Sequence, residues 1–116
     1  MARSAPLVLP FDSVTADHRD VAGGKAASLA QLARDGVRVP PGVCITTHAY
    51  KLHVKQAGFR ERILLELNRK PFEDMRWEEV WDLALRIRNL FLITPLAPAL
   101  EKKLRRELEP RFGDRA

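Results

Sequence analysis

Apolar residues recur at steps of three and four positions over most of the chain, which is the spacing of one face of an α-helix. In the first such run Ala26, Leu29 and Ala30 repeat at this spacing, and alanine and leucine are strong helix formers. The same periodicity predicts about five helices, over residues 24–35, 47–57, 59–68, 74–93 and 97–109.

Two short segments lack the helical period and are typical of β-strands. Residues 6–11 (PLVLPF) are apolar between prolines, which are tolerated at strand ends and sheet edges. Residues 43–46 (VCIT) form a mostly β-branched run directly after the helix-breaking sequence Pro-Pro-Gly. Residues 12–22 are mostly polar and predict a loop. The expected fold class is therefore α+β, mostly helical, with two short N-terminal strands.

Residues with known preferences for helix ends mark the expected boundaries. Gly36 follows the first helix, where a glycine in the left-handed conformation commonly ends a helix. Thr47 and Asp74 are predicted to cap the second and fourth helices, because their side-chain oxygens can accept an N–H of the first turn. Pro110 and Gly113 are expected to end the last helix.

The apolar faces of these helices predict the core. In the third helix we expect Ile63, Leu64 and Leu67 to point inward. The fourth helix carries an aromatic and aliphatic stripe that is more typical of a core than of a ligand platform. This stripe comprises Trp77, Val80, Trp81, Ala84, Ile87 and Phe91.

The length of 116 residues suits one small domain, and we expect residues 1–116 to form a single one. No apolar run approaches the ~20 residues of a membrane span, and the composition is that of an ordinary soluble protein. Cys44 is the only cysteine, so no internal disulfide is possible. We expect Cys44 to be a small buried hydrophobe and the protein to be cytoplasmic.

The net charge of +5 allows for an anionic partner. The basic residues of the last third are interleaved with acids, among them Glu101 and Glu107, so we interpret this segment mostly as a solvated helix face. Binding to nucleic acid is therefore not favoured.

One lysine stands out from the other charges. Gly23 and Gly24 precede Lys25 at the predicted start of the first helix. The first N–H groups of a helix have no intrahelical partner and, with the helix dipole, favour an anion. Glycines leave the backbone open to a ligand, and a lysine adds a full positive charge. This segment could bind a phosphate, although it does not match a P-loop, because Arg19 stands where the first glycine should be.

Other candidate chemistry is weaker. His18, His48 and His53 are scattered, are not spaced for a metal pair, and are each expected at the surface. No serine, histidine and acid set is present, so we expect no catalytic and no metal-ligating residues in this chain.

The segment from Val21 to Tyr50, VAGGKAASLAQLARDGVRVPPGVCITTHAY, resembles the opening of the ATP-binding domain of phosphoenolpyruvate synthases, pyruvate phosphate dikinases and rifampicin phosphotransferases. The shared features are a GGK, small and leucine residues on a helix, a glycine turn, V-P-x-G, and a short strand leading to T-T-x-A-Y. Val43 departs from the family, which usually has phenylalanine there; this is a packing change.

This resemblance implies an ATP-grasp-like domain in which Lys25 contacts nucleotide phosphate and Gly23 and Gly24 shape the backbone beside it. It also implies ATP and magnesium as ligands of the intact enzyme, with no tight binding by this chain alone. The arginine-serine-serine segment, acidic metal ligands, phosphohistidine domain and phosphoenolpyruvate-binding barrel of the family have no counterpart in these 116 residues. We therefore expect the first subdomain of the nucleotide-binding domain, not catalytic alone. A fragment, a truncated gene product and a stand-alone remnant all stay open.

A second reading is a small basic module, not an enzyme, that binds a protein partner or nucleic acid through the last helix. It requires Lys102, Lys103, Arg106 and Arg111 to form one basic face. Under the first reading the partners are ATP, bound weakly, and the remaining domains of the parent enzyme. Apolar surface left exposed there should also favour self-association.

Overall fold

The computed structural model describes residues 6–113, and within them the chain divides into two compact units. The first, here the sheet unit, comprises Met1–Leu52 together with Pro98–Ala116. The second, here the hairpin unit, comprises His53–Ala97. The prediction of an α+β fold with two short strands is confirmed.

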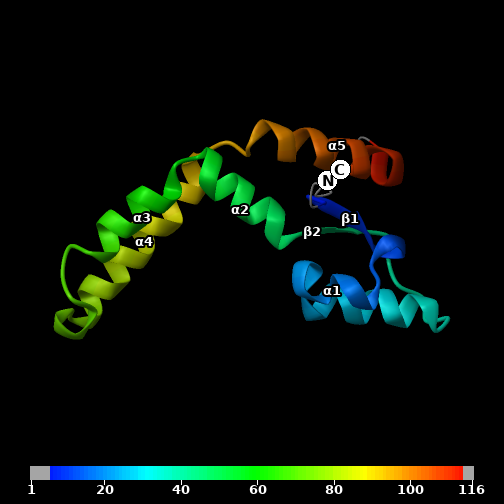
Figure 1. Ribbon diagram of the computed structural model, residues 1–116, viewed down its shortest axis with the longest axis horizontal. Helices are drawn as coiled ribbons and strands as arrows, with labels where there is room; N and C mark the ends of the chain where they lie inside the picture. The colour runs from blue at the N-terminus through cyan, green and yellow to red at the C-terminus, as the bar shows by residue number, and fades with distance from the viewer. Residues whose placement is uncertain (1–5, 114–116) are drawn as a thin grey trace. The chain divides into compact units, whose positions relative to one another are not determined.

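The sheet unit is built on two antiparallel strands, β1 (Val8–Pro10) and β2 (Val43–Ile45). They pair with Leu9 opposite Cys44. In Figure 1 helix α1 (Arg19–Arg34) lies on one side of this sheet and helix α5 (Pro98–Phe112) on the other. Because the pairing joins residues far apart in sequence, it closes the long loop formed by α1 and its neighbouring turns.

The core of the sheet unit is small and lies between α1 and the strands. Its buried members come from β1, from the turn after it, from α1 and from β2: Leu9, Val14, Ala26, Ala30 and Cys44. The two alanines are buried, as expected for the inner face of the first helix. Their small side chains let α1 approach the sheet closely. Burial of Cys44, which is 8% exposed, confirms the expectation for that residue.

The segment expected to be a loop, 12–22, is largely helical. Short 3-10 helices η1 (Phe11–Ser13) and η2 (Ala16–His18) precede α1, which already begins at Arg19. The Thr15 N–H donates to Nδ1 of His18 at 3.0 Å and stabilises η2. Local hydrogen bonds of this kind leave no trace in the hydrophobic pattern, so the prediction was wrong here.

Two of the predicted caps are also wrong. The start of α2 (Thr47–Gln56) is capped by Thr46, whose Oγ1 accepts the Ala49 N–H at 3.3 Å, and not by Thr47. The fourth helix, α4 (Trp77–Ile93), begins after Arg76 and not after Asp74, which ends the 3-10 helix η3 (Phe72–Asp74).

The end of the last helix was also predicted too early. Helix α5 runs through Pro110 to Phe112 before Gly113, whose φ is 60°. A proline in the final turn removes one backbone hydrogen bond without ending the helix.

Gly36 and Gly42 are required for different reasons. Gly36 has φ 88° and ends α1 as predicted, with its N–H bonded to Ala33 O and that of Val37 bonded to Leu32 O. Gly42 precedes β2, and a Cβ on it would lie 2.8 Å from the ring of Phe11. The Pro-Pro-Gly sequence therefore ends in glycine because an aromatic ring covers that position.

The hairpin unit consists of the end of α2, α3 (Phe59–Leu67) and α4, with α3 and α4 side by side in Figure 1. Gly58, with φ 69°, makes the turn between α2 and α3. Phe59 is fully buried, and its ring lies 4.6 Å from that of Phe91 and 5.4 Å from that of His53. This aromatic cluster is the core of the unit.

The inward face predicted for α3 is wrong. Leu64 and Leu67 are 43% and 44% exposed and Ile63 is half-buried, while Phe59 is the buried side chain of this helix. The spacing identified residues that share a face, but the neighbouring helix covers little of that face.

The face predicted for α4 is partly right: Phe91, near its C-terminal end, packs in the aromatic cluster, but both tryptophans are exposed. Trp77 and Trp81 are 69% and 60% exposed, and Ala84 is exposed too. Leu83 and Leu90 are the buried residues of α4. These two leucines and the ring of Phe91 are α4 side chains that pack inside the unit.

No single helix in the region 6–113 is long and apolar enough to cross a bilayer. Only the combined length and composition of α4 and α5, which are separated by a break, would suffice for a membrane span.

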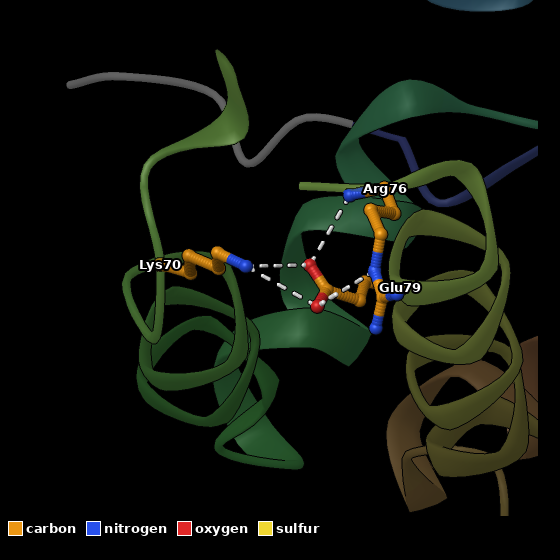
Figure 2. Close-up of polar contacts among 3 residues, drawn as sticks. All are labelled: Lys70, Arg76 and Glu79. Atoms are coloured by element: carbon orange, nitrogen blue, oxygen red, sulfur yellow. Dashed lines mark hydrogen bonds and ion pairs between the residues drawn. The ribbon is translucent and has the colours of Figure 1, made fainter. Parts of the chain in front are cut away.

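The connection between α3 and α4 is held by Glu79 (Figure 2). Its carboxylate accepts hydrogen bonds from Nζ of Lys70 at 3.1 and 3.2 Å and from the Arg76 N–H at 3.2 Å. The Lys70 ammonium, followed by the Arg76 N–H, lowers the pKa of Glu79 below its ordinary value of 4.5.

Because the folded-state pKa of Glu79 is lowered, its stabilising contribution is present above pH 4.5 and disappears as the pH falls through the folded-state pKa. Glu79→Gln should therefore lower the urea midpoint of the hairpin unit at pH 7, and the difference from the unaltered chain should shrink towards pH 3. Tryptophan fluorescence reports the transition, because both tryptophans lie on α4. Glu73→Gln, an exposed residue of η3, is the control, and an equal effect of both variants would contradict the assignment.

Candidate functional site

Helix α1 is broken at Gly23. Its φ of 85° and ψ of 165° are not helical, so the chain makes one turn from Arg19 and starts a longer segment at Gly24 that runs to Arg34. A Cβ on Gly23 would meet nothing within 4 Å, so the backbone conformation, not lack of space, requires glycine. The sequence prediction of a helix start at this position is thus close to what the structure has.

Gly23, Gly24 and Lys25 are all exposed. Ala26 and Ala30 fix the rotation of the segment, since they are 8% and 1% exposed and face the core. Within the described residues, Lys25 makes no ion pair or side-chain hydrogen bond. The Lys25 ammonium therefore has no charged partner among the described residues, and it lies next to exposed glycine backbone at the start of a helical segment.

The structure adds Arg19 to this site. Its Nη2 lies 3.7 Å from where a Cβ of Gly24 would be, so the guanidinium lies against the second glycine. Arg19 also lines a hollow between η2 and α1 together with Ser28 and Gln31; Lys25 is not among its lining residues. The sequence did not predict Arg19 as a site residue, and its only role there was to show that the segment is not a P-loop. Spacing alone does not reveal how the break at Gly23 orients the preceding turn.

Arg34, at the other end of the same hollow, is already engaged. Its guanidinium donates to the carbonyl oxygen of Val14 and, at 3.5 Å, to Oε1 of Gln31. Arg34 therefore ties the turn after β1 to α1, while Arg19 and Lys25 form no ion pair within residues 6–113.

His53 does not match its prediction as a surface residue. It is 7% exposed, and its Nδ1 accepts the Ala97 N–H at 3.2 Å. It serves as a packing and hydrogen-bonding residue of the hairpin unit. Nowhere in the described part of the chain do three or more histidine, cysteine or acidic side chains gather as a metal site would require.

Taken together, the glycine break and its two cations define a cationic helix entry on an α+β lobe, and comparison with known proteins identifies the family. Residues 19–114 match the family model described as "Pyruvate phosphate dikinase, AMP/ATP-binding domain". The match covers most of the chain, so the chain belongs to this family.

Individual relatives agree. The chain is 33% identical over 106 residues to a probable phosphoenolpyruvate synthase of Staphylothermus marinus, covering 89% of this chain and 12% of the relative. It is 40% identical over 94 residues to a rifampicin phosphotransferase of a Streptomyces species, covering 80% and 11%. It is 31% identical over 106 residues to the phosphoenolpyruvate synthase of Escherichia coli. That match covers 88% of this chain and 13% of the relative. The chain thus spans about an eighth of the length of these relatives.

Cys44 is the one nucleophilic thiol of the chain, and its surroundings argue against reactivity. Its Sγ lies 3.3 Å from the carbonyl oxygen of Ala22, to which it donates, and burial raises its pKa above the ordinary 9.0. A raised pKa leaves less thiolate at neutral pH, and thiolate is the reactive form.

We expect Cys44 to react with a disulfide reagent at pH 7.5 at least tenfold more slowly in the folded chain than in 6 M guanidinium chloride. The release of the chromophore from an aromatic disulfide measures both rates. A folded-state rate equal to that of the unfolded chain would show that the thiol is open to solvent.

Proposed function

We propose that this chain contributes to an ATP-binding site in which Lys25 and the backbone at Gly23 and Gly24 contact the nucleotide phosphates. The observation that carries the proposal is the break at Gly23, which begins a helical segment at an exposed position directly before an ammonium without a partner among the described residues. Membership of a family described as AMP/ATP-binding supports it.

The physical basis is the combination of three features. N–H groups at the start of a helical segment favour an anion. Glycines at that point allow the phosphate oxygens to come close to the backbone. Lys25 supplies a mobile charge, and Arg19, which lies against Gly24, supplies a second cation that can donate two parallel hydrogen bonds.

We further propose that phosphoryl transfer to a catalytic histidine takes place in a longer protein and not in this chain alone. Such a reaction depends on positioning and on charge stabilisation by groups around the whole triphosphate. This chain supplies cations on one side; the magnesium that accompanies ATP would be held by the phosphates and by ligands outside these residues. The names of the relatives, synthases and a phosphotransferase, support this reading.

Titration of the 116-residue chain with ATP tests the proposal. We expect weak binding, with a dissociation constant in the millimolar range, and amide shifts in a nitrogen-15 NMR spectrum that are largest at residues 23–26. Lys25→Ala should weaken binding by about twofold to fivefold, the effect of one exposed charge pair. Lys51→Ala, an exposed lysine of α2, is the matched control.

Two outcomes would contradict the assignment of Lys25. One is that both lysine variants bind ATP equally well. The other is that the shifts lie on α5 or in the hairpin unit instead of at the break in α1.

A second candidate function, binding of a polyanion, rests on a different observation. A hollow beside β1 is lined by cations of α5, namely Lys102, Lys103 and Arg106. Acids relieve part of this charge, because Lys103 is ion-paired with Glu107 at 3.2 Å.

Salt dependence separates the two functions. With two cations of α5 left without an ion pair in the described region, a single-stranded oligonucleotide should bind with a slope of log affinity against log salt no steeper than about −1.5. A titration by fluorescence anisotropy between 50 and 300 mM salt measures it. A slope steeper than about −3 would favour the nucleic-acid module over the ATP site.

A further inference from the structure

Helix α4 carries an exposed apolar stripe that nothing in its own unit covers. Trp77, Trp81 and Leu92 are 69%, 60% and 68% exposed, and Leu85 is 43% exposed. These residues follow one another at steps of four and seven along one side of the helix, with Arg88 in the remaining position. We call Trp77, Trp81, Leu85, Arg88 and Leu92 the tryptophan stripe. The opposite side of α4 holds the buried Leu83 and Leu90.

The stripe has a definite internal order. Its N-terminal half is aromatic, with the two indole rings 6.1 Å apart, and acids Glu78 and Asp82 flank it. Its C-terminal half is aliphatic and carries Arg88. Within residues 6–113, none of these three charged side chains forms an ion pair.

We propose that a second copy of this chain covers the tryptophan stripe, with the two α4 helices antiparallel about a twofold axis near Ala84 and Leu85. A twofold interface brings residue i of one copy to residue j of the other and also j to i. In this arrangement Arg88 meets the face of Trp81 and lies beside Asp82 of the second copy. The aromatic Trp77 then packs on the aliphatic Leu92.

Charge selects the antiparallel orientation. Two parallel helices would place Arg88 against Arg88 and Glu78 against Glu78, and would align their dipoles. Antiparallel helices pair the acidic half with the basic position, oppose the dipoles, and allow a cation–π contact between Arg88 and Trp81. The small side chain of Ala84 at the centre lets the backbones approach closely.

The interface is short, since a helix of 17 residues is about 25 Å long. A contact of this size belongs to the weak, transient class of protein interfaces. We therefore expect a weak, reversible dimer and not a permanent one. The proposal concerns a surface of the hairpin unit and is independent of the ATP site at Lys25.

A charge swap tests both the surface and the orientation. Sedimentation equilibrium of the unaltered chain between about 5 and 500 μM should fit a monomer–dimer equilibrium. Arg88→Glu brings a second carboxylate beside Asp82, and Asp82→Arg places two cations together, so each should weaken the dimer at least tenfold. The double variant Asp82→Arg/Arg88→Glu restores opposite charges and should return to within about fivefold of the unaltered chain.

Arg38→Glu, an exposed residue in the loop after α1, changes the net charge by the same amount as Arg88→Glu and should leave the dimer unaffected. Circular dichroism of all variants checks that the helices are intact, which is expected since Asp82 and Arg88 are exposed. The proposal is overturned if the unaltered chain stays monomeric at about 500 μM. It is also overturned if the double variant dimerises no more tightly than either single variant. The monomeric result would point to another part of a longer polypeptide as the cover.

Discussion

The buried hydroxyl of Thr46 is the interaction on which the sheet unit depends. It is 1% exposed, donates to the carbonyl oxygen of Pro6 at 2.6 Å, and accepts the N–H of Ala49. One side chain thus joins the segment just before β1 to the start of α2, although the two bonded residues Pro6 and Thr46 are 40 positions apart. A buried hydroxyl without these partners would be costly, so the hydroxyl couples the stability of the strand pairing to that of the entry into α2. The glycine break of α1 lies within the loop that this contact closes.

The helices were predictable from the sequence because apolar spacing, alanine and leucine content, and Gly36 all pointed to the same segments. The faces that these helices bury were harder to predict. Spacing shows which residues share a face, but only a packing partner decides whether that face is inside. On α4 the bulkiest side chains, Trp77 and Trp81, are exposed. His53 was missed for the same reason, since its partner, the N–H of Ala97, lies 44 positions away in the sequence.

The candidate site was found from its glycines and lysine, because these residue types carry their own conformational and electrostatic preferences. Lys25 and the Gly23 break could be located in this way. Arg19 could not, since its place against Gly24 depends on the backbone angles of Gly23 and not on its distance along the chain. Membership of the dikinase family adds an expectation of ATP, and the proposed phosphate contacts rest on the two cations beside the break.

The contact between Gly42 and Phe11 links two positions that lie in different parts of the sequence. The phenyl ring occupies the volume that any side chain at residue 42 would need. Packing against Phe11 is therefore sufficient reason for glycine in the V-P-P-G sequence. A side chain at position 42 requires the ring at position 11 to shift or to be replaced by a smaller group, so the two positions should tend to change together among relatives.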